Sequence, residues 1–546
     1  MRKFLPVLLL LFVVVLTAST CRRRVDASVV TVASPENFTT LDTLTTAKSD
    51  AAAERVRTLI FNALVKKDEN FDYVGELASS ITPSADGLKI TFVLRDGVKF
   101  HNGKDFTSAD VKYTFDQLFA ANGYKAGAFF DTVADTDAKT APPPAAANAN
   151  ANSGAKPADF KTKSVPQITS IETPDPKTVI FAIARPSLKN QLLANLVAIP
   201  IIPEGSVAQQ KDDPVGTGPF KFTSFDASQN IVELAANEQY WNGAPKFPKL
   251  RIKTVTDATS LQAELQTGGV DIAPNPSNLP PDMLKAIGTM PNLRVDQFDG
   301  SNLQYVVFNV SSGPLSNVKI RQAIGYAIDR ERIVKDLFSG QATVANAIVP
   351  AQSWAYSAGH TYAFDPQKAK QLVKDAGYNN EPINFKFGSG NAATSQYGQV
   401  IQSSLAGIGL NVQIDPLEVN VVRQQLAQGQ FQMYTGIWIG GNTDPIFLRD
   451  LFATSRIPDN KLVSCCNRGR YSNPEFDKTV EDAVNATDKT QAKQLYAKAW
   501  DIASNDLPLL PLWYPANIVV SNKRIGNVKM SGSGDWGFLK DITVNQ

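Results

Sequence analysis

One stretch, residues 86–119, constrains the fold more than any other, because strand, turn and helix signals follow one another in it without a gap. Asp96-Gly97 supplies a turn that accepts positive φ, and a second strand is expected over residues 98–101. The first strand is predicted from apolar side chains at every second position, which give it one buried face: Leu88, Ile90, Phe92 and Leu94. This half of the stretch therefore predicts a β-hairpin.

A helix is expected directly after the hairpin. The chain turns again at Asn102-Gly103, and Thr107 followed three residues later by Asp110 has the pattern of a capping box, which opens a helix. The apolar residues that follow return to one helical face: Val111, Phe115, Leu118 and Phe119. The whole stretch is thus predicted to fold as a hairpin and then a helix.

This order of residues, "DG…TF.LRDGVKFH.GK.FT..DV", resembles the signature of the family 5 extracellular solute-binding proteins, the periplasmic oligopeptide- and dipeptide-binding proteins of ABC importers. Later stretches resemble the same family in the same order: GTGPFKF at 216–222, YWNGAPK at 240–246, GGVDI at 268–272 and VKIRQAIGYAIDRERI at 318–333. The resemblance covers the chain from about Val29 to the C-terminus, apart from one insertion.

The resemblance implies a mixed α/β, periplasmic-binding-protein-like fold of type II, peptide-binding subclass. It has two lobes joined by a hinge, and the first lobe carries an extra subdomain. Lobe I is expected to consist of residues 28–70, 198–301 and 507–546, the extra subdomain of residues 71–197, and lobe II of residues 302–506. The chain would leave lobe I near Asn302 and return near Leu507, and a ligand would bind between the lobes.

The first 27 residues are predicted to be an export signal. A basic start, Met1-Arg2-Lys3, precedes an apolar run at 4–16, which is shorter than the roughly 20 residues that a membrane-spanning helix needs. Cleavage before Cys21 would leave a lipidated cysteine, cleavage after Ala27 an ordinary mature end, and no cleavage a signal anchor. We expect the lipoprotein, held at the periplasmic or outer face of a membrane; all three alternatives place the body of the protein outside the cytoplasm.

Residues 135–163 differ in composition and in apolar pattern from the rest of the chain. Their centre, APPPAAANANANSGAKPAD, lacks apolar periodicity, so we expect a flexible surface insertion. The chain as a whole, with 43% apolar and 19% charged residues, is that of a folded protein. Its formal net charge of +2 gives no electrostatic reason to expect nucleic acid as a partner.

Signals for catalysis or for a bound cofactor are missing from the sequence. Its two histidines, His101 and His360, lie far apart and have no cysteines at metal-ligand spacing. No nucleophile elbow, phosphate-binding loop or dinucleotide fingerprint can be found. We therefore expect neither a metal nor a cofactor, and a protein that is not an enzyme.

The best candidate for a binding site is YTGIWIGGNTD at 434–444. Trp438 ends an apolar strand just before a glycine-rich loop, where a ligand could approach the backbone closely; a core tryptophan beside an ordinary loop is the alternative. Dipeptide-binding relatives carry at these positions a tryptophan, an aspartate that pairs with the peptide's amino terminus, and a turn ending in Asp-Pro. Trp438 and Asp444-Pro445 fit this pattern, but Gly441 stands where the amine-binding aspartate is expected.

A buried ammonium without a carboxylate partner is strongly disfavoured. Either Asp444 takes over that role, or the ligand is a blocked peptide, an oligosaccharide or another neutral compound. Aromatic residues on the later apolar strand are secondary candidates, because their faces suit peptide side chains and sugar rings. The predicted ligand-binding residues are Trp438, Gly440, Gly441, Asn442, Asp444, Trp513 and Tyr514.

Two adjacent cysteines, Cys465 and Cys466, remain if Cys21 is lipidated or removed. They could close a vicinal disulfide in an oxidising compartment, or stay as two thiols in a loop.

By resemblance, the protein is predicted to be the solute-binding component of an ABC importer. It would be a monomer that binds a peptide or similar small solute and docks on permease subunits in the membrane. The alternatives are an oligosaccharide-binding member of the same family, a sensor or scaffold without transport, and an extracellular hydrolase that uses paired carboxylates.

Overall fold

The computed structural model describes residues 28–48, 50–134, 162–389, 391–440, 443–459 and 466–545. The predicted signal segment with Cys21 lies outside these residues, and so does the predicted insertion as far as residue 161. Residues 162 and 163, which we had assigned to the insertion, begin strand β7 (Thr162–Pro166), which pairs with β6 (Phe130–Ala134).

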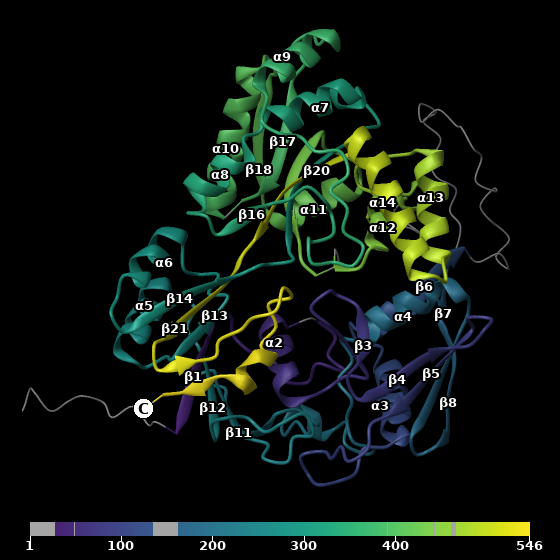
Figure 1. The fold of residues 1–546 in the computed structure, drawn as a ribbon, viewed down its shortest axis with the longest axis vertical. Helices are drawn as coiled ribbons and strands as arrows, with labels where there is room; N and C mark the ends of the chain where they lie inside the picture. Colours follow the sequence, from purple (N-terminus) through teal and green to yellow (C-terminus); the bar gives the residue numbers. More distant parts are fainter. Residues whose placement is uncertain are drawn as a thin grey trace, which may run out of the picture.

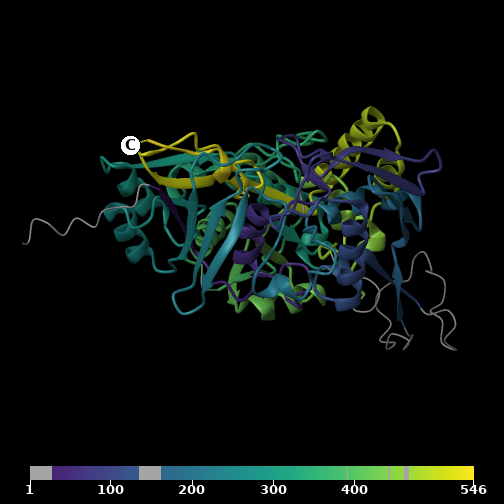
Figure 2. The same cartoon turned by 90° about the horizontal axis from the view of Figure 1, so that it is seen from below.

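A seven-stranded sheet forms the centre of the first lobe, in the order β10-β11-β12-β1-β13-β21-β14. Its strands are β1 (Val29–Ser34), β10 (Phe220–Asp226), β11 (Ile231–Ala236), β12 (Lys249–Thr254), β13 (Ile272–Pro274), β14 (Leu293–Phe298) and β21 (Asn517–Asn522). β1 runs parallel to β12 and β13, and the remaining pairs are antiparallel. Strand β21, from near the C-terminus, therefore lies inside the same sheet as the N-terminal strand β1, and Figure 2 shows it in yellow beside the teal strands of this sheet.

Helices cover both faces of this sheet. On one face, α2 (Ala51–Ile60) packs Val56 and Leu59 into the same core as Val30 and Val32 of β1. On the other face, α5 (Ala258–Thr267) and α6 (Pro281–Gly288) enclose a smaller core. Helix α5 ends at Gly268, which has a φ of 76°, the left-handed region that favours glycine.

The second lobe is built on a six-stranded sheet in the order β16-β20-β15-β19-β17-β18. Its strands are β15 (Leu303–Phe308), β16 (Ala342–Val344), β17 (Ile383–Gly388), β18 (Val412–Leu417), β19 (Met433–Trp438) and β20 (Leu509–Pro515). One face packs against α7 (Val318–Ala327), α8 (Arg330–Leu337), α9 (Pro366–Asp375) and α10 (Ala392–Gly407). The other face packs against α11 (Val419–Ala427), α12 (Phe447–Phe452), α13 (Pro474–Asn485) and α14 (Lys489–Asp506). Figure 1 shows the two groups of helices on opposite flanks of this sheet.

Aspartate and asparagine side chains cap the starts of several helices in this lobe. Asp329 accepts a hydrogen bond from the backbone N–H of Arg332, and Asp365 accepts one from Lys368. Asn473 accepts one from Glu475 at the start of α13. Each cap satisfies backbone donors that the first turn of a helix leaves unpaired.

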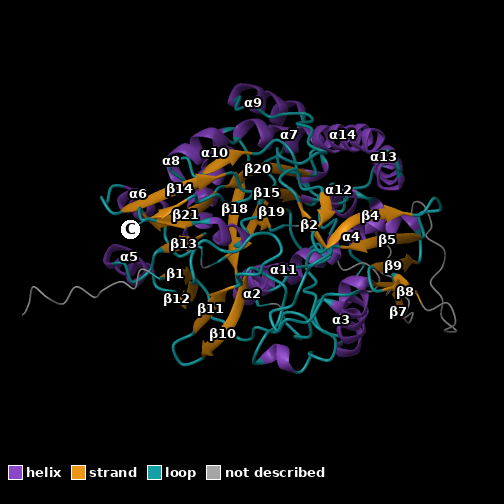
Figure 3. Ribbon diagram, turned by 60° about the horizontal axis from the view of Figure 1, so that its bottom comes forward, coloured by secondary structure: helices purple, strands orange, loops and turns teal. Residues whose placement is uncertain are grey.

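The extra subdomain contains a four-stranded sheet, β4-β5-β9-β8, formed by β4 (Ala78–Pro83), β5 (Lys89–Leu94), β8 (Ile168–Asp175) and β9 (Thr178–Ile183). Helices α3 (Ser108–Ala121) and α4 (Lys189–Leu196) accompany it, at one end of the molecule in Figure 3. Its Phe92, Phe115 and Phe181 belong to the same continuous core as Val30 and Val32 of β1. The subdomain is therefore packed onto the first lobe through a shared core.

Half of the prediction for residues 86–119 is confirmed. Strand β5 and the capping box of α3 are present, with Thr107 N–H donating to Asp110 Oδ2 at 2.9 Å. The predicted hairpin is wrong, because β5 pairs with β4 and β9 and residues 98–101 form only an isolated bridge, from Lys99 to Asp105. The turns at Asp96-Gly97 and Asn102-Gly103 lie so close together that the segment between them, residues 98–101, is too short to pair as a strand.

Two crossings join the lobes, one between β14 and β15 and the other at Ala516, between β20 and β21. The second differs from the expected return near Leu507, because β20 pairs with β15 and β16 and so belongs to the second sheet. The crossings touch at Gly300, where a Cβ atom would lie only 1.9 Å from the carbonyl oxygen of Pro515. Only glycine fits there.

His101 has a structural role in the first lobe. Its Nδ1 accepts a hydrogen bond from Gly216 N–H at 3.3 Å, and its Nε2 lies 3.0 Å from the carbonyl oxygen of Gly218. Both glycines belong to the 216–218 turn, which presses against α2 so closely that a Cβ on Gly216 would lie 2.1 Å from Ile60 O. Burial lowers the pKa of His101 to about 4, so the imidazole is neutral at neutral pH.

This histidine predicts a loss of stability in mild acid. The unfolded chain takes up a proton below its ordinary pKa of 6.5, but the folded chain does not until about pH 4, so the free energy of unfolding falls as the pH drops through that window. Glutamine cannot titrate. We therefore expect the free energy of unfolding of His101→Gln to fall by about 2 kcal/mol less than that of the unchanged protein between pH 7 and pH 5. Urea unfolding at both pH values measures this, and equal losses in the two proteins would contradict it.

Candidate functional site

Trp438 lies at the end of the second sheet that faces the first lobe. It is the last residue of β19 and pairs with Leu303, the first residue of β15 after the crossing. Its ring stacks on Tyr305 with centroids 5.7 Å apart and 15° between the planes, and the edge of Phe447 meets it at 5.0 Å. The indole Nε1 is buried and has no hydrogen-bond partner among the described residues.

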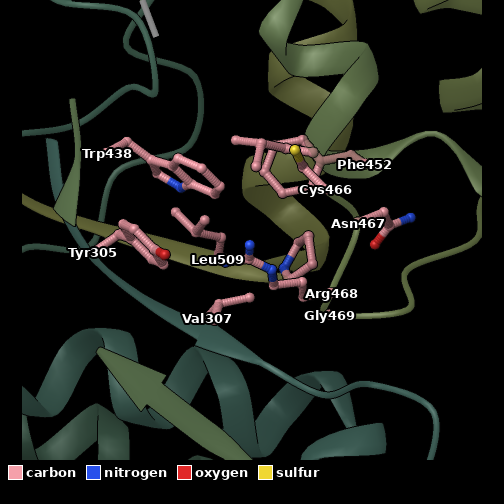
Figure 4. Close-up of a pocket in the computed structure, with 11 residues that line it drawn as sticks. Tyr305, Val307, Trp438, Phe452, Cys466, Asn467, Arg468, Gly469 and Leu509 are labelled. Atoms are coloured by element: carbon pink, nitrogen blue, oxygen red, sulfur yellow. The ribbon is translucent and has the colours of Figure 1, made fainter. Parts of the chain in front are cut away.

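A pocket opens beside this ring, between β15, β20 and α12 (Figure 4). Its cavity volume is only about 10 Å³, the room of about one water molecule, so its own side chains nearly fill it. The guanidinium carbon of Arg468 lies 5.5 Å from the Trp438 ring centroid, and Arg468 Nε is buried without a partner in the described part of the chain. The lining residues are Tyr305, Val307, Trp438, Leu451, Phe452, Cys466, Asn467, Arg468, Gly469, Pro508 and Leu509.

Asp444 is engaged by the first lobe. Tyr73 OH donates to Asp444 Oδ2, and the backbone N–H of Ile446 donates to Oδ1 at 2.9 Å. Lys67 binds the neighbouring Thr443 through Nζ and Oγ1, and burial lowers the pKa of Lys67 while the charge of Asp444 raises it. Burial, and then Asp444, raise the pKa of Tyr73, so the phenol keeps its proton. The Asp444 carboxylate thus already has a cation and two donors beside it.

Tyr73 and Lys67 belong to a small hairpin of the first lobe, formed by β2 (Val65–Lys67) and β3 (Tyr73–Gly75). The same hairpin reaches α14, where Lys489 Nζ lies 2.6 and 2.5 Å from the two Asp72 carboxylate oxygens. Trp354 N–H of the second lobe also donates to Asn70 O at 3.2 Å. Hairpin 65–75 therefore makes several polar contacts with the second lobe beside the Trp438 loop.

A wider hollow of about 1310 Å³, counting its open side, lies next to hairpin 65–75 at the hinge. It is bordered by both lobes and by the first crossing. Its lining residues are Lys66, Lys67, Asp68, Glu69, Phe71, Phe298, Asp299, Gln352, Lys529, Met530, Ser531, Gly532 and Ser533.

Two of the predicted site residues are in the core. Trp513 is 1% exposed and packs its ring against Tyr397 and Phe338, each at 5.1 Å. Tyr514 is buried on the opposite face of β20, and its hydroxyl donates to Ala347 O at 2.6 Å and lies 2.8 Å from Val349 O. Neither side chain lines the pocket or the hinge hollow, so we remove both from the candidate site.

The remaining predictions fall around the loop after β19. Gly440 has a φ of 73°, the left-handed region that favours glycine. Gly441 and Asn442 lie outside the described residues, and their predicted contacts with a ligand stay predictions. Cys466 is disulfide-bonded, but Cys465 is also outside the described part, so the vicinal pairing stays a prediction.

Lys67, Tyr73 and Arg468 were not predicted from the sequence. Tyr73 and Asp444 are 371 residues apart in the chain, and no local pattern links them. A lone arginine after two cysteines carries no signal of its own. Only the fold brings these residues to the Trp438 loop.

Comparison with known proteins identifies the family. The model of the bacterial extracellular solute-binding proteins, family 5 (middle region), matches residues 72–460. The chain belongs to this family. Among curated relatives of this solute-binding protein, heme-binding protein A of Haemophilus influenzae is 29% identical over 511 residues, covering 88% of this chain and 86% of the relative. Glutathione-binding protein GsiB of Salmonella typhimurium is 29% identical over 498 residues, covering 88% of each chain.

Solved structures agree with the two-lobe, mixed α/β fold. HbpA2 from Haemophilus parasuis superposes with a TM-score of 0.77 at 23% identity, over 95% of this chain and all of that one (100%). The periplasmic binding protein DppA from Helicobacter pylori, solved in complex with the peptide STSA, gives 0.68 at 24% identity, over 95% and 98%. The fold class expected from the opening stretch is thereby confirmed.

Membrane-spanning helices and metal-binding clusters are both absent from the described residues. No helix among them is long and apolar enough to cross a membrane. They also contain no group of three histidine, cysteine, aspartate or glutamate side chains that could hold a metal ion.

Proposed function

We propose that this solute-binding protein binds a short peptide or similar small solute between its lobes, at the Trp438 loop, and delivers it to the permease of an ABC importer. The family match over residues 72–460 carries the proposal, together with the position of Trp438 at the edge of the second sheet that faces the first lobe. Closure of the lobes would bury the solute, and the solute favours the closed form only through its higher affinity for that form.

The class of solute follows from the relatives and the site together. The relatives described above are named for heme and glutathione or were solved with a peptide. The half-buried ring of Trp438, with buried Tyr305 stacked behind it, offers a flat apolar surface, and the loop after it would offer backbone groups, which suits an extended peptide. A monomer outside the cytoplasm, anchored through lipidated Cys21 and without catalytic activity, completes the proposal.

Native mass spectrometry tests the proposal. Protein purified without unfolding is expected to carry a bound solute of peptide size that is released on denaturation. The same mass spectrum is expected to show no turnover products when peptides or oligosaccharides are added. Hydrolysis of either class by the purified protein would overturn the binding role in favour of the carboxylate hydrolase.

The contacts of Asp444 predict how much the amino terminus of a peptide contributes to its affinity. Because Tyr73 OH already donates to this carboxylate and the charge of Lys67 lies near it, a free ligand amine gains little there. We expect Ala-Ala-Ala and N-acetyl-Ala-Ala-Ala to bind with dissociation constants within about threefold of each other, since an exposed amine contributes little. Isothermal titration calorimetry with protein refolded free of solute measures both; more than tenfold weaker binding of the acetylated peptide would show that a carboxylate does bind the amine.

A further inference from the structure

Four exposed apolar side chains of the second lobe come from two short segments. Ten large apolar side chains are exposed among the described residues, and these four make up a large share of them. Val419 and Val421 lie at the start of α11, and Ile437 and Ile439 lie on either side of Trp438 at the end of β19. Ile439 is 74% exposed, more than any other of the ten. We call these four residues, 419, 421, 437 and 439, the apolar rim.

Both segments of the apolar rim lie at one edge of the six-stranded sheet. β17 runs parallel to β18 and to β19, so the three strands end on the same side. Gly388, the last residue of β17, pairs with Leu417 of β18, and a Cβ atom on Gly388 would lie 3.1 Å from Val419 Cγ2. This is the edge at which Trp438 faces the first lobe, and Figure 1 shows α11 on that side. Ligands of α/β proteins bind outside the carboxyl ends of such strands.

The first lobe touches the loop after β19 and still leaves Ile439 uncovered. Lys67 Nζ donates to Thr443 Oγ1, and that hydroxyl lies 2.7 Å from the carbonyl oxygen of Gly440, the neighbour of Ile439. The lobes are therefore in contact only four residues further along the chain, yet Ile439 is 74% exposed. The two lobes in contact leave a space on this side chain that neither of them fills.

Polar groups beside the apolar rim already have partners. Glu418 accepts hydrogen bonds from the backbone N–H groups of Asn420 and Val421 at 2.9 and 3.2 Å, and so caps α11. Asp444 accepts one from Tyr73. What remains open at this edge is apolar surface, whose removal from water is favourable in proportion to its area. Clustered exposed apolar side chains of this kind mark binding sites.

We propose that the apolar rim binds a large apolar side chain of the solute, so that the protein prefers peptides with such a residue over peptides with a polar residue of the same size. The inference rests on the proposed function and deepens it, because it names the class of peptide. A solute in contact with the Trp438 ring lies beside Ile437 and Ile439, which flank Trp438 in the chain. The solute is therefore the occupant of the space that the first lobe leaves open.

Three pairs of tripeptides test this preference. In each pair one residue of Ala-Ala-Ala, at the first, second or third position, is replaced by leucine or by asparagine, which has nearly the same shape but a polar amide. Isothermal titration calorimetry with the full exported chain, refolded free of solute, measures the affinities. We expect the leucine peptide of at least one pair to bind about 10- to 100-fold more tightly, because leucine gains from burial and asparagine loses hydrogen bonds to water. Its heat-capacity change on binding should be the more negative one, as burial of apolar surface predicts.

Variants assign the preference to the apolar rim. Ile439→Asn is expected to remove most of the preference for leucine and to shrink the difference in heat-capacity change, whereas Ile439→Leu, which keeps an apolar side chain, should retain both. Phe364→Asn is the matched control, because Phe364 is 51% exposed in the same lobe but lies outside the rim, directly before α9. It should keep the full preference. Circular dichroism and thermal unfolding establish that each variant is folded.

Equal affinities within all three pairs in the unchanged protein would overturn the apolar rim and leave the peptide-binding function standing; this comparison needs no variant. A preference for leucine that survives in folded Ile439→Asn also overturns it. If none of the tripeptides binds, the proposed function fails for peptides, and the inference that rests on it fails too.

Two other occupants of the apolar rim give different results. If a second copy of the chain covers it, Ile439→Asn dissociates a dimer in sedimentation experiments and leaves the preference for leucine unchanged. If the first lobe covers it in solution, small-angle X-ray scattering shows that the solute-free variant is more open than the unchanged protein, again with the preference intact. Either result overturns the proposal.

Discussion

Arg330→Met is expected to lower the free energy of unfolding by about 3–5 kcal/mol, because it removes a buried cation on which four groups depend. Arg330 is 7% exposed at the start of α8. Its Nη1 donates to Ala345 O and, at 2.9 Å, to Pro511 O, and its Nη2 donates to Tyr362 O at 2.9 Å and to Asn346 Oδ1 at 3.3 Å. Burial lowers its pKa to about 10, so it still carries its charge at pH 7.

The same helix offers a matched control. Arg332 has a side chain that is 77% exposed and, within the described part of the chain, forms an ion pair only with Asp336, one turn further along α8. Arg332→Met makes the same chemical change on the surface, where such pairs contribute about 0–1 kcal/mol. Urea unfolding of both variants measures the difference, and similar losses in the two would show that Arg330 does not clamp β20 to its neighbouring loops.

Trp438→Ala is expected to weaken binding of a tripeptide such as Ala-Ala-Ala by about 30- to 1,000-fold, the loss of 2–4 kcal/mol that removal of a central aromatic anchor causes. The truncation removes both the stack on Tyr305 and the indole N–H at the pocket. Trp438→Phe should fall between the unchanged protein and Trp438→Ala. Calorimetric titration of the three proteins gives the comparison.

Trp241→Ala is the control for that experiment. Trp241 is also half-buried, but it lies in the first lobe, where its Nε1 donates to Asn62 Oδ1 at 3.1 Å. Its removal should lower stability without changing the affinity of the folded molecules for the peptide. Equal effects of the two truncations on affinity would mean that Trp438 acts through folding and not through contact with the solute.

Local signals in the sequence predicted part of the extra subdomain. The capping box of Thr107 and Asp110, which opens α3, was predicted and is present. Such caps are local, so a short window of sequence contains all of their physics. The family resemblance then supplied the two-lobe architecture, which no window contains.

Pairing between distant segments was beyond the sequence. Strand β5 was predicted, but its partner β9 lies some 85 residues away, and the nearer segment at 98–101 was chosen instead. The candidate site was predicted only in part for the same reason. Trp438 was predicted because it precedes a glycine-rich loop. The hydrogen bond from Tyr73 to Asp444 was not, because it forms only where the two lobes meet. Trp513 and Tyr514 had the composition of a ligand surface, and only the packing of α8, α10 and the 345–349 loop on β20 shows that they are core.

A crystal structure of the protein purified without unfolding tests the central claim most directly. The account predicts electron density for a small solute between the lobes, in contact with the Trp438 ring. Solute bound elsewhere, with Trp438 touching only protein atoms, would contradict it.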